Sequence, residues 1–335
     1  MAETVWTREF TPRDDGIHRS DSPGRWEWWY FDADLDNGYT VAGTFHFGSP
    51  RPPAYPDARF IEIALYDPEG NRRMIRKRYP KDQCSALEET CKVVIGPNVF
   101  EGEIPKYHLH FSEGEVGADL TYESVVQGYG PVETGWGGTT MWWAASASRS
   151  KVSGTLTWGG QTMGVKGEGY HDHNWSDVPM AESTGAENAF WGRLYIGDWT
   201  LNWQGGRMVR KMAYRPAGRL IAYKKDKIVA ISDKGSGVGA DFTPGDTGIE
   251  YPQTITIAYD DPGLVEGEMK LKVTKVIEFM DLHSRFKPFQ RWYAETFVGR
   301  PAYFRHRFDY DVDMTIVGER VTGKGCSWCE HHKMV

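Results

Sequence analysis

Apolar and polar residues alternate with a period of two along most of this chain of 335 residues. Such alternation places successive side chains on opposite faces of a β-strand. The clearest examples are residues 40–47, 59–66, 106–111, 254–259, 269–273 and 310–316. Only residues 83–90 and 286–297 have a pattern that permits a short helix, so the alternation predicts an all-β fold.

Turn-forming residues separate the alternating segments. Residues 36–38 (Asp-Asn-Gly), 67–70 (Asp-Pro-Glu-Gly) and 260–263 (Asp-Asp-Pro-Gly) are examples, and all three favour tight turns. Short strands at a spacing of roughly 8–12 residues are typical of antiparallel sandwiches and barrels. We therefore expect the strands to be antiparallel.

The length of the chain suggests two domains. Residues 176–187 form a loop of small and acidic residues without a clear period, which makes this stretch the best candidate for a boundary. We expect one β domain over residues 1–184 and a second over residues 185–335. No repeat of 20–50 residues is evident, but each half has a comparable number of predicted strands, so two packed β units are the simplest arrangement.

The charge of the chain limits its partners. A formal net charge of −7 argues against a dedicated nucleic-acid binder, which usually carries a basic balance or stripe. The basic stretch 72–78 alternates loosely with apolar residues, so it is either a solvated strand face or a patch for an anionic ligand or membrane surface. No apolar run approaches the ~20 residues of a membrane span, and the N-terminus lacks the pattern of a secretory signal. We expect a cytoplasmic protein without an integral membrane segment.

The four cysteines form two local pairs, which are too sparse for a disulfide scaffold in a chain of this length. The C-terminal stretch has the composition of a zinc site but lacks a second ligand pair at finger-like spacing. A frayed tail or a local thiol pair is the preferred interpretation, and whether the tail binds metal stays open. Its residues are Cys326, Cys329, His331 and His332.

Aromatic residues make up 14% of the chain, and one cluster of them occupies residues 26–32. On a strand this segment is aromatic on both faces, which requires burial on both sides. It is therefore a central strand between a core and a domain interface, or one of its faces lines a ligand cavity. One face carries Trp26, Trp28, Tyr30 and Asp32, and the other carries Glu27, Trp29 and Phe31.

Residues 168–175 bring together an unusual number of ionisable groups. If the segment is extended, Tyr170 and Asp172 share one face, and His171 and His173 share the other. Two histidines on one face resemble metal ligands, but no third ligand can be placed from the sequence, so no metal is expected. The segment is either a hydrogen-bonded strand end or an acid–base cluster, because a carboxyl group among Tyr and Trp residues is in an environment that shifts its pKa.

Known cofactor and hydrolase motifs are missing from the sequence. It contains no Gly-rich phosphate loop, dinucleotide fingerprint, Gly-x-Ser-x-Gly elbow or His-Glu-x-x-His motif. We therefore expect no cofactor. Arg193, in the aromatic stretch 190–199, could pair with Asp172 or Glu27, and that pairing would keep the carboxylate ionised.

The segments 26–32, 169–175 and 191–193 follow one another in an order and spacing that resemble those of a known family. This family is the group of lipocalin-like proteins related to carotenoid 1,2-hydratase (hydroxyneurosporene synthase). That group includes kievitone hydratase, AttH-type bacterial proteins and fungal decalin-forming Diels–Alderases. The resemblance spans nearly the whole chain and implies two packed lipocalin-like β-barrel or sandwich units without an organic cofactor. In the hydratases a Tyr-x-Asp element is the suspected acid site, which corresponds here to Tyr170 and Asp172. Their upstream His/Trp element aligns loosely with residues 141–143, where this chain has no histidine.

The leading hypothesis is a cofactor-independent acid–base enzyme, either a hydratase/dehydratase or a cyclase/isomerase, that acts on an apolar isoprenoid or polyketide-like molecule. The alternatives are a pericyclase that preorganises a polyene, and a non-catalytic carrier of hydrophobic ligands. The substrate and the oligomeric state cannot be predicted from the sequence. The candidate catalytic residues are Asp172, Tyr170, Glu27 and His171. The candidate substrate-binding residues are Trp28, Trp29, Tyr30, Trp142, Trp143, Asn174, Trp175, Trp191 and Arg193.

Overall fold

The computed structural model describes residues 9–48, 57–134, 141–179, 186–245, 248–282, 289, 292 and 300–333. The chain divides into two compact units at residue 184, here called the N-terminal unit and the C-terminal unit. Each unit contains one antiparallel sheet, which confirms the all-β fold predicted from the alternating pattern. The helix that the pattern permits over residues 286–297 lies almost wholly outside the described residues.

The N-terminal unit is a single sheet in which every described strand pair is antiparallel. Its order is β4-β3-β2-β1-β12-β11-β9-β8-β7-β6-β5, and β10 pairs with β11. The elements are the 3-10 helices η1 (Pro12–Asp15) and η2 (Lys81–Gln83) and the strands β1 (Trp26–Leu35), β2 (Thr40–Gly48), β3 (Arg59–Tyr66), β4 (Arg72–Arg78), β5 (Cys84–Ala86), β6 (Cys91–Ile95), β7 (Asn98–Glu103), β8 (Lys106–Glu113), β9 (Val116–Ser124), β10 (Tyr129–Glu133), β11 (Met141–Trp158) and β12 (Gln161–Ser176).

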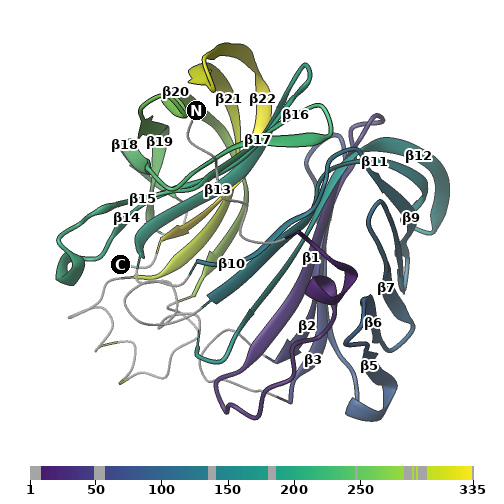
Figure 1. Cartoon of the computed structure of the whole chain (residues 1–335). Coiled ribbons are helices and arrows are strands. Elements are labelled where there is room, and N and C mark those ends of the chain that lie inside the picture. Colours follow the sequence, from purple (N-terminus) through teal and green to yellow (C-terminus); the bar gives the residue numbers. More distant parts are fainter. Residues whose placement is uncertain are drawn as a thin grey trace. The chain divides into compact units, whose positions relative to one another are not determined.

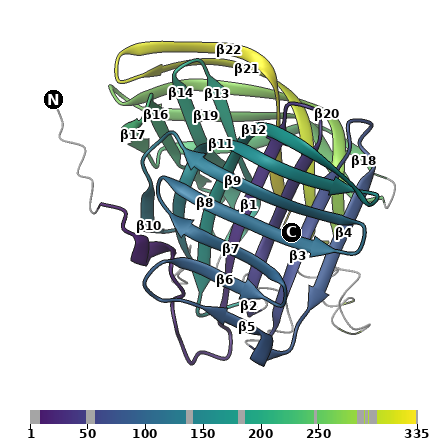
Figure 2. The same ribbon diagram turned by 90° about the vertical axis from the view of Figure 1, so that its right-hand side faces the viewer.

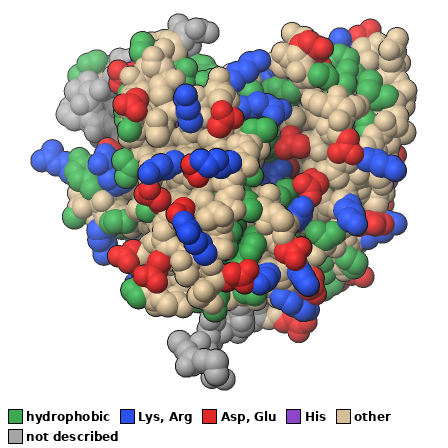
Figure 3. Space-filling view, turned by 90° about the horizontal axis from the view of Figure 1, so that it is seen from above, with side chains coloured by type: hydrophobic (Ala, Val, Ile, Leu, Met, Phe, Trp, Pro, Cys, Tyr) green, Lys and Arg blue, Asp and Glu red, His purple; other side chains and the backbone are tan. Residues whose placement is uncertain are grey.

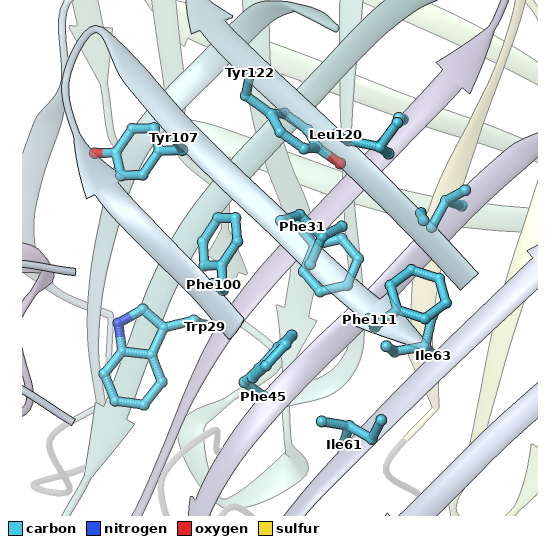
Figure 4. Close-up of a cluster of buried hydrophobic side chains, with 14 of the residues drawn as sticks. Trp29, Phe31, Phe45, Ile61, Ile63, Phe100, Tyr107, Phe111, Leu120 and Tyr122 are labelled. Carbon is cyan, nitrogen blue, oxygen red and sulfur yellow. The ribbon is translucent and has the colours of Figure 1, made fainter. Parts of the chain in front are cut away.

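This sheet curls, so that strands β5–β9 lie opposite strands β1–β3 (Figures 1 and 2). The space between them is filled by side chains from both ends of the sheet (Figure 4). Trp29, Phe31 and Phe45 come from one end, and Phe100 and Tyr122 come from the other; all five are fully buried. The alternation of the sequence thus places one face of each strand in a closed hydrophobic core.

The helix permitted over residues 83–90 does not form. A 3-10 turn ends at Gln83, and Cys84–Ala86 then joins the sheet as β5. Cys84 pairs with Ile95 of β6, so these residues obtain their backbone hydrogen bonds from a neighbouring strand. Sheet pairing with distant residues therefore overrides a weak local preference for helix.

The C-terminal unit is also one antiparallel sheet, in the order β17-β16-β14-β13-β22-β21-β20-β19-β18, with β15 beside β14. Its elements are the 3-10 helix η3 (Arg210–Met212) and the strands β13 (Ala186–Ile196), β14 (Trp199–Met208), β15 (Pro216–Ala217), β16 (Leu220–Lys224), β17 (Lys227–Ser232), β18 (Gly235–Pro244), β19 (Glu250–Asp261), β20 (Val265–Asp281), β21 (Ala302–Ile316) and β22 (Glu319–Lys333).

The two units repeat one strand order. In each unit the first strand pairs with the last strand, β1 with β12 and β13 with β22, and a tight hairpin joins the last two strands. Counting from these hairpins aligns residues 167–174 with residues 325–332. The topology of the two β units therefore repeats, although little of the sequence does.

The C-terminal tail is not frayed, contrary to the sequence interpretation. It forms strand β22, which pairs with both β21 and β13. Residues three apart on a strand point to opposite faces, and accordingly Cys326 is exposed while Cys329 is buried. The Cys-x-x-Cys stretch therefore cannot present both thiols to one metal ion.

The basic stretch 72–78 forms edge strand β4, whose side chains are mostly exposed. Several of them pair with acidic side chains, including Arg76 with Glu62 and Lys77 with Glu113. On the face shown in Figure 3, basic and acidic side chains are intermixed. Among the described residues, no helix has the length and apolar composition that a membrane-spanning segment needs.

Candidate functional site

Strands β1, β12 and β11 lie side by side at the centre of the N-terminal sheet. The register places Tyr30 beside Asp172, and it places Trp28 and Trp143 on either side of Asn174. All five side chains point to the face that does not form the hydrophobic core of the N-terminal unit, which we call the Asp172 face. Alternation along three adjacent strands therefore gathers them on one surface of the sheet.

Asp172 is the centre of this face. Its Oδ2 accepts hydrogen bonds from Trp143 Nε1 at 2.9 Å and from the Tyr170 hydroxyl at 2.8 Å. Its Oδ1 accepts a hydrogen bond from Asn174 Nδ2 at 2.8 Å. The side chain is only 5% exposed. Donors that point at a carboxylate favour its ionised form, so this geometry suits Asp172 to accept a proton.

Aromatic rings surround the carboxylate on the same face. The Tyr30 ring lies 6.0 Å from the Tyr170 ring in an edge-to-face arrangement, and both are buried. Trp28 stacks on Trp26 at 4.4 Å and lies edge-on to His46. Besides the group of hydrogen bonds at Asp172, this face carries the buried polar side chains of Asp32 and His46.

Glu27 lies on the opposite face, which we call the core face. Its Oε1 accepts a hydrogen bond from His173 Nε2 at 2.9 Å and lies 3.2 Å from His18 Nδ1. Its Oε2 accepts a hydrogen bond from Arg25 at 2.9 Å. Burial acts to raise the pKa of Glu27, but the hydrogen bonds from His173 and His18 outweigh it and lower the pKa to about 2. Glu27 is therefore a permanently ionised, fully buried carboxylate.

His171 lies on the core face as well. Its Nδ1 donates to the backbone carbonyl of Tyr30 at 2.8 Å, and its Nε2 lies 2.9 Å from a carboxylate oxygen of Asp15. Burial acts to lower the pKa of His171, but the Asp15 carboxylate outweighs it and raises the pKa. The rings of Phe100 and Tyr107 lie edge-on to the imidazole within the core. His171 and Asp15 thus form a buried ion pair.

The structure therefore divides the four candidate catalytic residues. Tyr170 and Asp172 are together on one face, whereas Glu27 and His171 are on the other, with the sheet between them. The cause is the two-residue period of a strand, which separates each residue from its neighbours in sequence.

The candidate aromatic residues also divide between the two faces. On the core face Trp29 stacks on His173 at 4.4 Å, and Trp175 stacks on His18 at 3.7 Å. Trp142 lies parallel to Trp175 at 6.3 Å. Trp143 and Asn174, which the sequence groups with the ligand-lining residues, instead hydrogen-bond to Asp172 directly.

Trp191 and Arg193 belong to the C-terminal unit. The register places Trp191 beside Glu330, which is the counterpart of Asp172 in the repeat. Arg193 is buried, donates to the Tyr195 hydroxyl at 2.8 Å and lies over the Trp328 ring at 4.8 Å. These contacts order a second aromatic and cationic cluster within that unit.

Two residues of the N-terminal segment escaped the sequence analysis. Asp15, in the 3-10 helix η1, pairs with His171, which is 156 residues away, and His18, in irregular structure, contacts Glu27, which is nine residues away. No periodic pattern marks them. The need of the buried residues Glu27 and His171 for charged partners is the one signal that could have pointed to His18 and Asp15.

Two groups of side chains come close enough to hold a metal ion within the described residues. The group of Asp15, Cys91 and His171 is fully buried, and burial raises the pKa of the Cys91 thiol well above its ordinary value. A thiol that stays protonated is a poor ligand. The other group is His18, Glu27 and His173, of which only His18 is partly exposed.

No protein-family model matches the sequence, and a comparison with curated proteins gave no match. Solved structures share its fold, and three of them are described here. A Nitrosomonas europaea protein described as AttH is 16% identical, with a TM-score of 0.69 and all of both chains covered. CghA bound to Sch210972 is 12% identical, with a TM-score of 0.66 over 97% of this chain and 95% of that chain. Kievitone hydratase from Nectria haematococca is 14% identical, with a TM-score of 0.61 over 98% of this chain and 92% of that chain.

These similarities establish the fold. CghA is a decalin-forming Diels–Alderase, so the three neighbours are of the kinds that the sequence resemblance named. Two of them are enzymes with different reactions, a hydratase and a Diels–Alderase. The fold is therefore compatible with catalysis, and the reaction has to be argued from the side chains.

Proposed function

We propose that this protein is a cofactor-independent enzyme that moves a proton on an apolar small molecule, with Asp172 as the proton acceptor and donor. The supporting observation is the buried Asp172 carboxylate, hydrogen-bonded by Tyr170, Trp143 and Asn174 on the Asp172 face. Three donors hold the carboxylate at a fixed position, and a fixed base near a bound substrate contributes about 10²–10⁴ to a rate.

The protonation state of Asp172 decides whether it first accepts or first donates a proton. Asp172 begins as a carboxylate. In a dehydration or isomerisation it takes a proton from a carbon of the substrate and returns it to the departing hydroxyl, which leaves as water, or to another carbon. In a hydration it takes the proton from the attacking water and returns it to a carbon of the substrate. Tyr170 lies within hydrogen-bond distance of Asp172 and orients it. This differs from the hypothesis drawn from the sequence, in which Asp172 begins as an acid, because the three described hydrogen bonds all come from donors, which favour the carboxylate.

The substrate class in this proposal rests on the composition of the site. Trp28 and Tyr30 offer aromatic rings beside the carboxylate, and such rings suit contact with an apolar molecule. Terpenoids and polyketide-like polyenes have the required apolar surface. Two compounds can serve as probes. Kievitone is named in kievitone hydratase, and Sch210972 is bound to CghA, and both proteins share this fold.

A pericyclase is the second candidate, because CghA shares the fold. In that case the site would act mainly by holding a polyene in a reactive conformation, which supplies on the order of 7–11 kcal/mol at best. Asp172 and its donors would then bind a polar group of the substrate. A proton-transfer enzyme loses its rate without Asp172, whereas a pericyclase does not.

Ligand binding tests the proposed substrate class. Kievitone, Sch210972, a linear polyene, glucose and ATP should be titrated into the full chain, with tryptophan fluorescence and melting temperature as readouts. We expect the apolar probes to quench fluorescence and to raise the melting temperature through linkage, and glucose and ATP to do neither. Binding of ATP or glucose in preference to every apolar probe would contradict the proposal.

A further inference from the structure

The cluster of His18, Glu27 and His173 lies on the core face and has no part in the proposed proton transfer. We propose that these three side chains bind a divalent transition-metal cation such as Zn²⁺. Their ligand atoms, two imidazole nitrogens and one carboxylate oxygen, all lie within 4.8 Å of one another. Two histidines and one carboxylate form a ligand set that zinc and similar cations use in proteins, with a further position left for water.

The outer partners of the cluster are those of a metal site. His173 directs its other ring nitrogen, Nδ1, at the backbone carbonyl of Asp14 at 3.3 Å and at a carboxylate oxygen of Asp15 at 3.7 Å. Arg25 hydrogen-bonds the second carboxylate oxygen of Glu27 at 2.9 Å. Metal-binding histidines commonly donate their second N–H to a carboxylate or a backbone carbonyl, which fixes the ring and its tautomer.

The C-terminal unit supplies an internal comparison. At the positions that match Glu27 and His173, it has Asn188 and His331, and the His331 Nε2 lies 3.0 Å from the amide oxygen of Asn188. Each histidine also stacks on an aromatic ring of the first strand, at 4.4 Å in one unit and 4.5 Å in the other. A neutral amide is thus sufficient to hold this histidine in the fold. Holding His173 in place therefore requires neither the negative charge of Glu27 nor the second imidazole, that of His18.

The cluster is also accessible to an ion. The side chains of Glu27 and His173 are fully buried, whereas that of His18 is 26% exposed. A cation can therefore enter from the side of His18. Once bound, it would tie the N-terminal segment that carries His18 to strands β1 and β12.

The sequence predicts no metal site, because it places no third ligand beside His171 and His173. The structure differs from that expectation in two respects. The two histidines have different partners, Asp15 for His171 and Glu27 for His173, and the third ligand is His18. His18 precedes β1 in irregular structure, where no strand pattern indicates its direction.

Zinc titration of the full chain by calorimetry tests this proposal. The background protein should carry His108→Ala and His110→Ala, because these exposed histidines both lie 3.0 Å from Asp119 and would bind zinc at the surface. In that background we expect one equivalent of Zn²⁺ to bind and to raise the melting temperature. Adding His18→Ala should weaken binding by about 100-fold or more and abolish the rise in melting temperature.

Glu27→Gln should have the same effect on binding, and Asn188→Ala in the C-terminal unit is the matched control that should leave zinc binding unchanged. His18 is partly exposed, so its replacement preserves the fold and remains decisive if the Glu27 variant does not fold. The proposal is overturned if the background protein binds no zinc, or if His18→Ala leaves binding unchanged. Neither result affects the proposed role of Asp172, which is on the other face.

Discussion

Strands β12 and β22 occupy the same place in the two units, but the carboxylates at their matching positions have different partners. Glu330 accepts a hydrogen bond from Arg305 at 3.0 Å, and Arg305 also pairs with Glu278 at 3.1 Å. The hydrogen bonds described for Asp172 come from Trp143, Tyr170 and Asn174, which carry no charge. A hydrogen bond from a charged donor such as Arg305 is stronger than one from a neutral donor and holds the carboxylate more firmly in its ionised form.

The pKa of Glu330 supports this contrast. Burial acts to raise it, but the hydrogen bond from His332 and the charge of Arg305 lower it to about 2. A carboxylate so strongly stabilised as an anion is a poor base near neutral pH. Under the proposed function, the same strand order therefore carries a reacting carboxylate, Asp172, in the N-terminal unit and an ion-paired carboxylate, Glu330, in the C-terminal unit.

The largest expected effect is on turnover, which should depend on Asp172 and not on Glu330. Asp172→Asn keeps the size of the side chain but cannot accept a proton, so turnover of an apolar substrate should fall by about 10²–10⁴ with ligand binding largely retained. Glu330→Gln is the matched control, and its turnover should stay within about threefold of the parent. Steady-state kinetics and circular dichroism of both variants measure this. A similar loss in both variants would erase the distinction between the units.

The next largest effect is expected on the free energy of unfolding. It concerns His171 and Cys329, which precede Asp172 and Glu330 on strands β12 and β22. His171 is half of a buried ion pair with Asp15, and its counterpart in β22 is the neutral Cys329. His171→Ala leaves the Asp15 carboxylate with less compensation and should cost about 3–5 kcal/mol of unfolding free energy. Cys329→Ala should cost clearly less. Denaturant unfolding measures both, and equal costs would contradict the assignment of a buried ion pair to the N-terminal unit.

A smaller effect depends on pH and arises in the C-terminal unit. Burial lowers the pKa of His306 to about 3, so the folded chain keeps this imidazole neutral. Below the unfolded value of 6.5 the unfolded chain binds a proton that the folded chain does not, so stability is complete above pH 6.5 and is lost as the pH falls. The loss approaches about 1.4 kcal/mol per pH unit.

His306→Asn should remove this dependence. Unfolding free energies of the parent and the variant at pH 7 and pH 5 give the comparison, with His108→Asn, at an exposed position, as the control. The parent should lose about 2 kcal/mol more than His306→Asn between these pH values. Equal losses in parent and variant would show that His306 titrates normally in the folded chain.

The smallest effect is expected at the tyrosine that orients Asp172. Tyr170→Phe removes one of the three described hydrogen bonds, worth about 0.5–1.5 kcal/mol, so turnover should fall by roughly 3–10-fold. Trp328 has the matching position beside Glu330, and Trp328→Phe should leave turnover nearly unchanged. Kinetics of the two variants provide the test. If Tyr170→Phe costs as much as Asp172→Asn, then Tyr170 itself transfers the proton.

The fold was largely predictable from the sequence, because two-residue alternation is a direct consequence of strand geometry. It indicated which residues of 26–32 and 168–175 share a face, and the register agrees. The repeat was not predictable. In the aligned stretches 167–174 and 325–332, a glycine, an aromatic residue, an acidic residue and a histidine correspond, and so short a match carries no weight without the hairpins that align it.

The site was predictable only in part. Asp172 and Tyr170 were indicated by their own strand, but the roles of Trp143 and Asn174 as donors to Asp172 depend on the register between strands β11 and β12. Sequence alone does not contain that register. The contacts of Asp15 were beyond prediction for a similar reason, since a segment without a period gives no direction to its side chains.

Turnover in D₂O tests the central claim, that Asp172 moves a proton to or from carbon, most directly. The apolar substrate found by the binding panel should be converted in D₂O, and the product and recovered substrate should then be analysed by mass spectrometry after back-exchange of hydroxyl protons. We predict carbon-bound deuterium with the parent protein and its absence with Asp172→Asn. Product formed at full rate without any carbon-bound deuterium in product or recovered substrate would contradict the account and favour a pericyclic reaction.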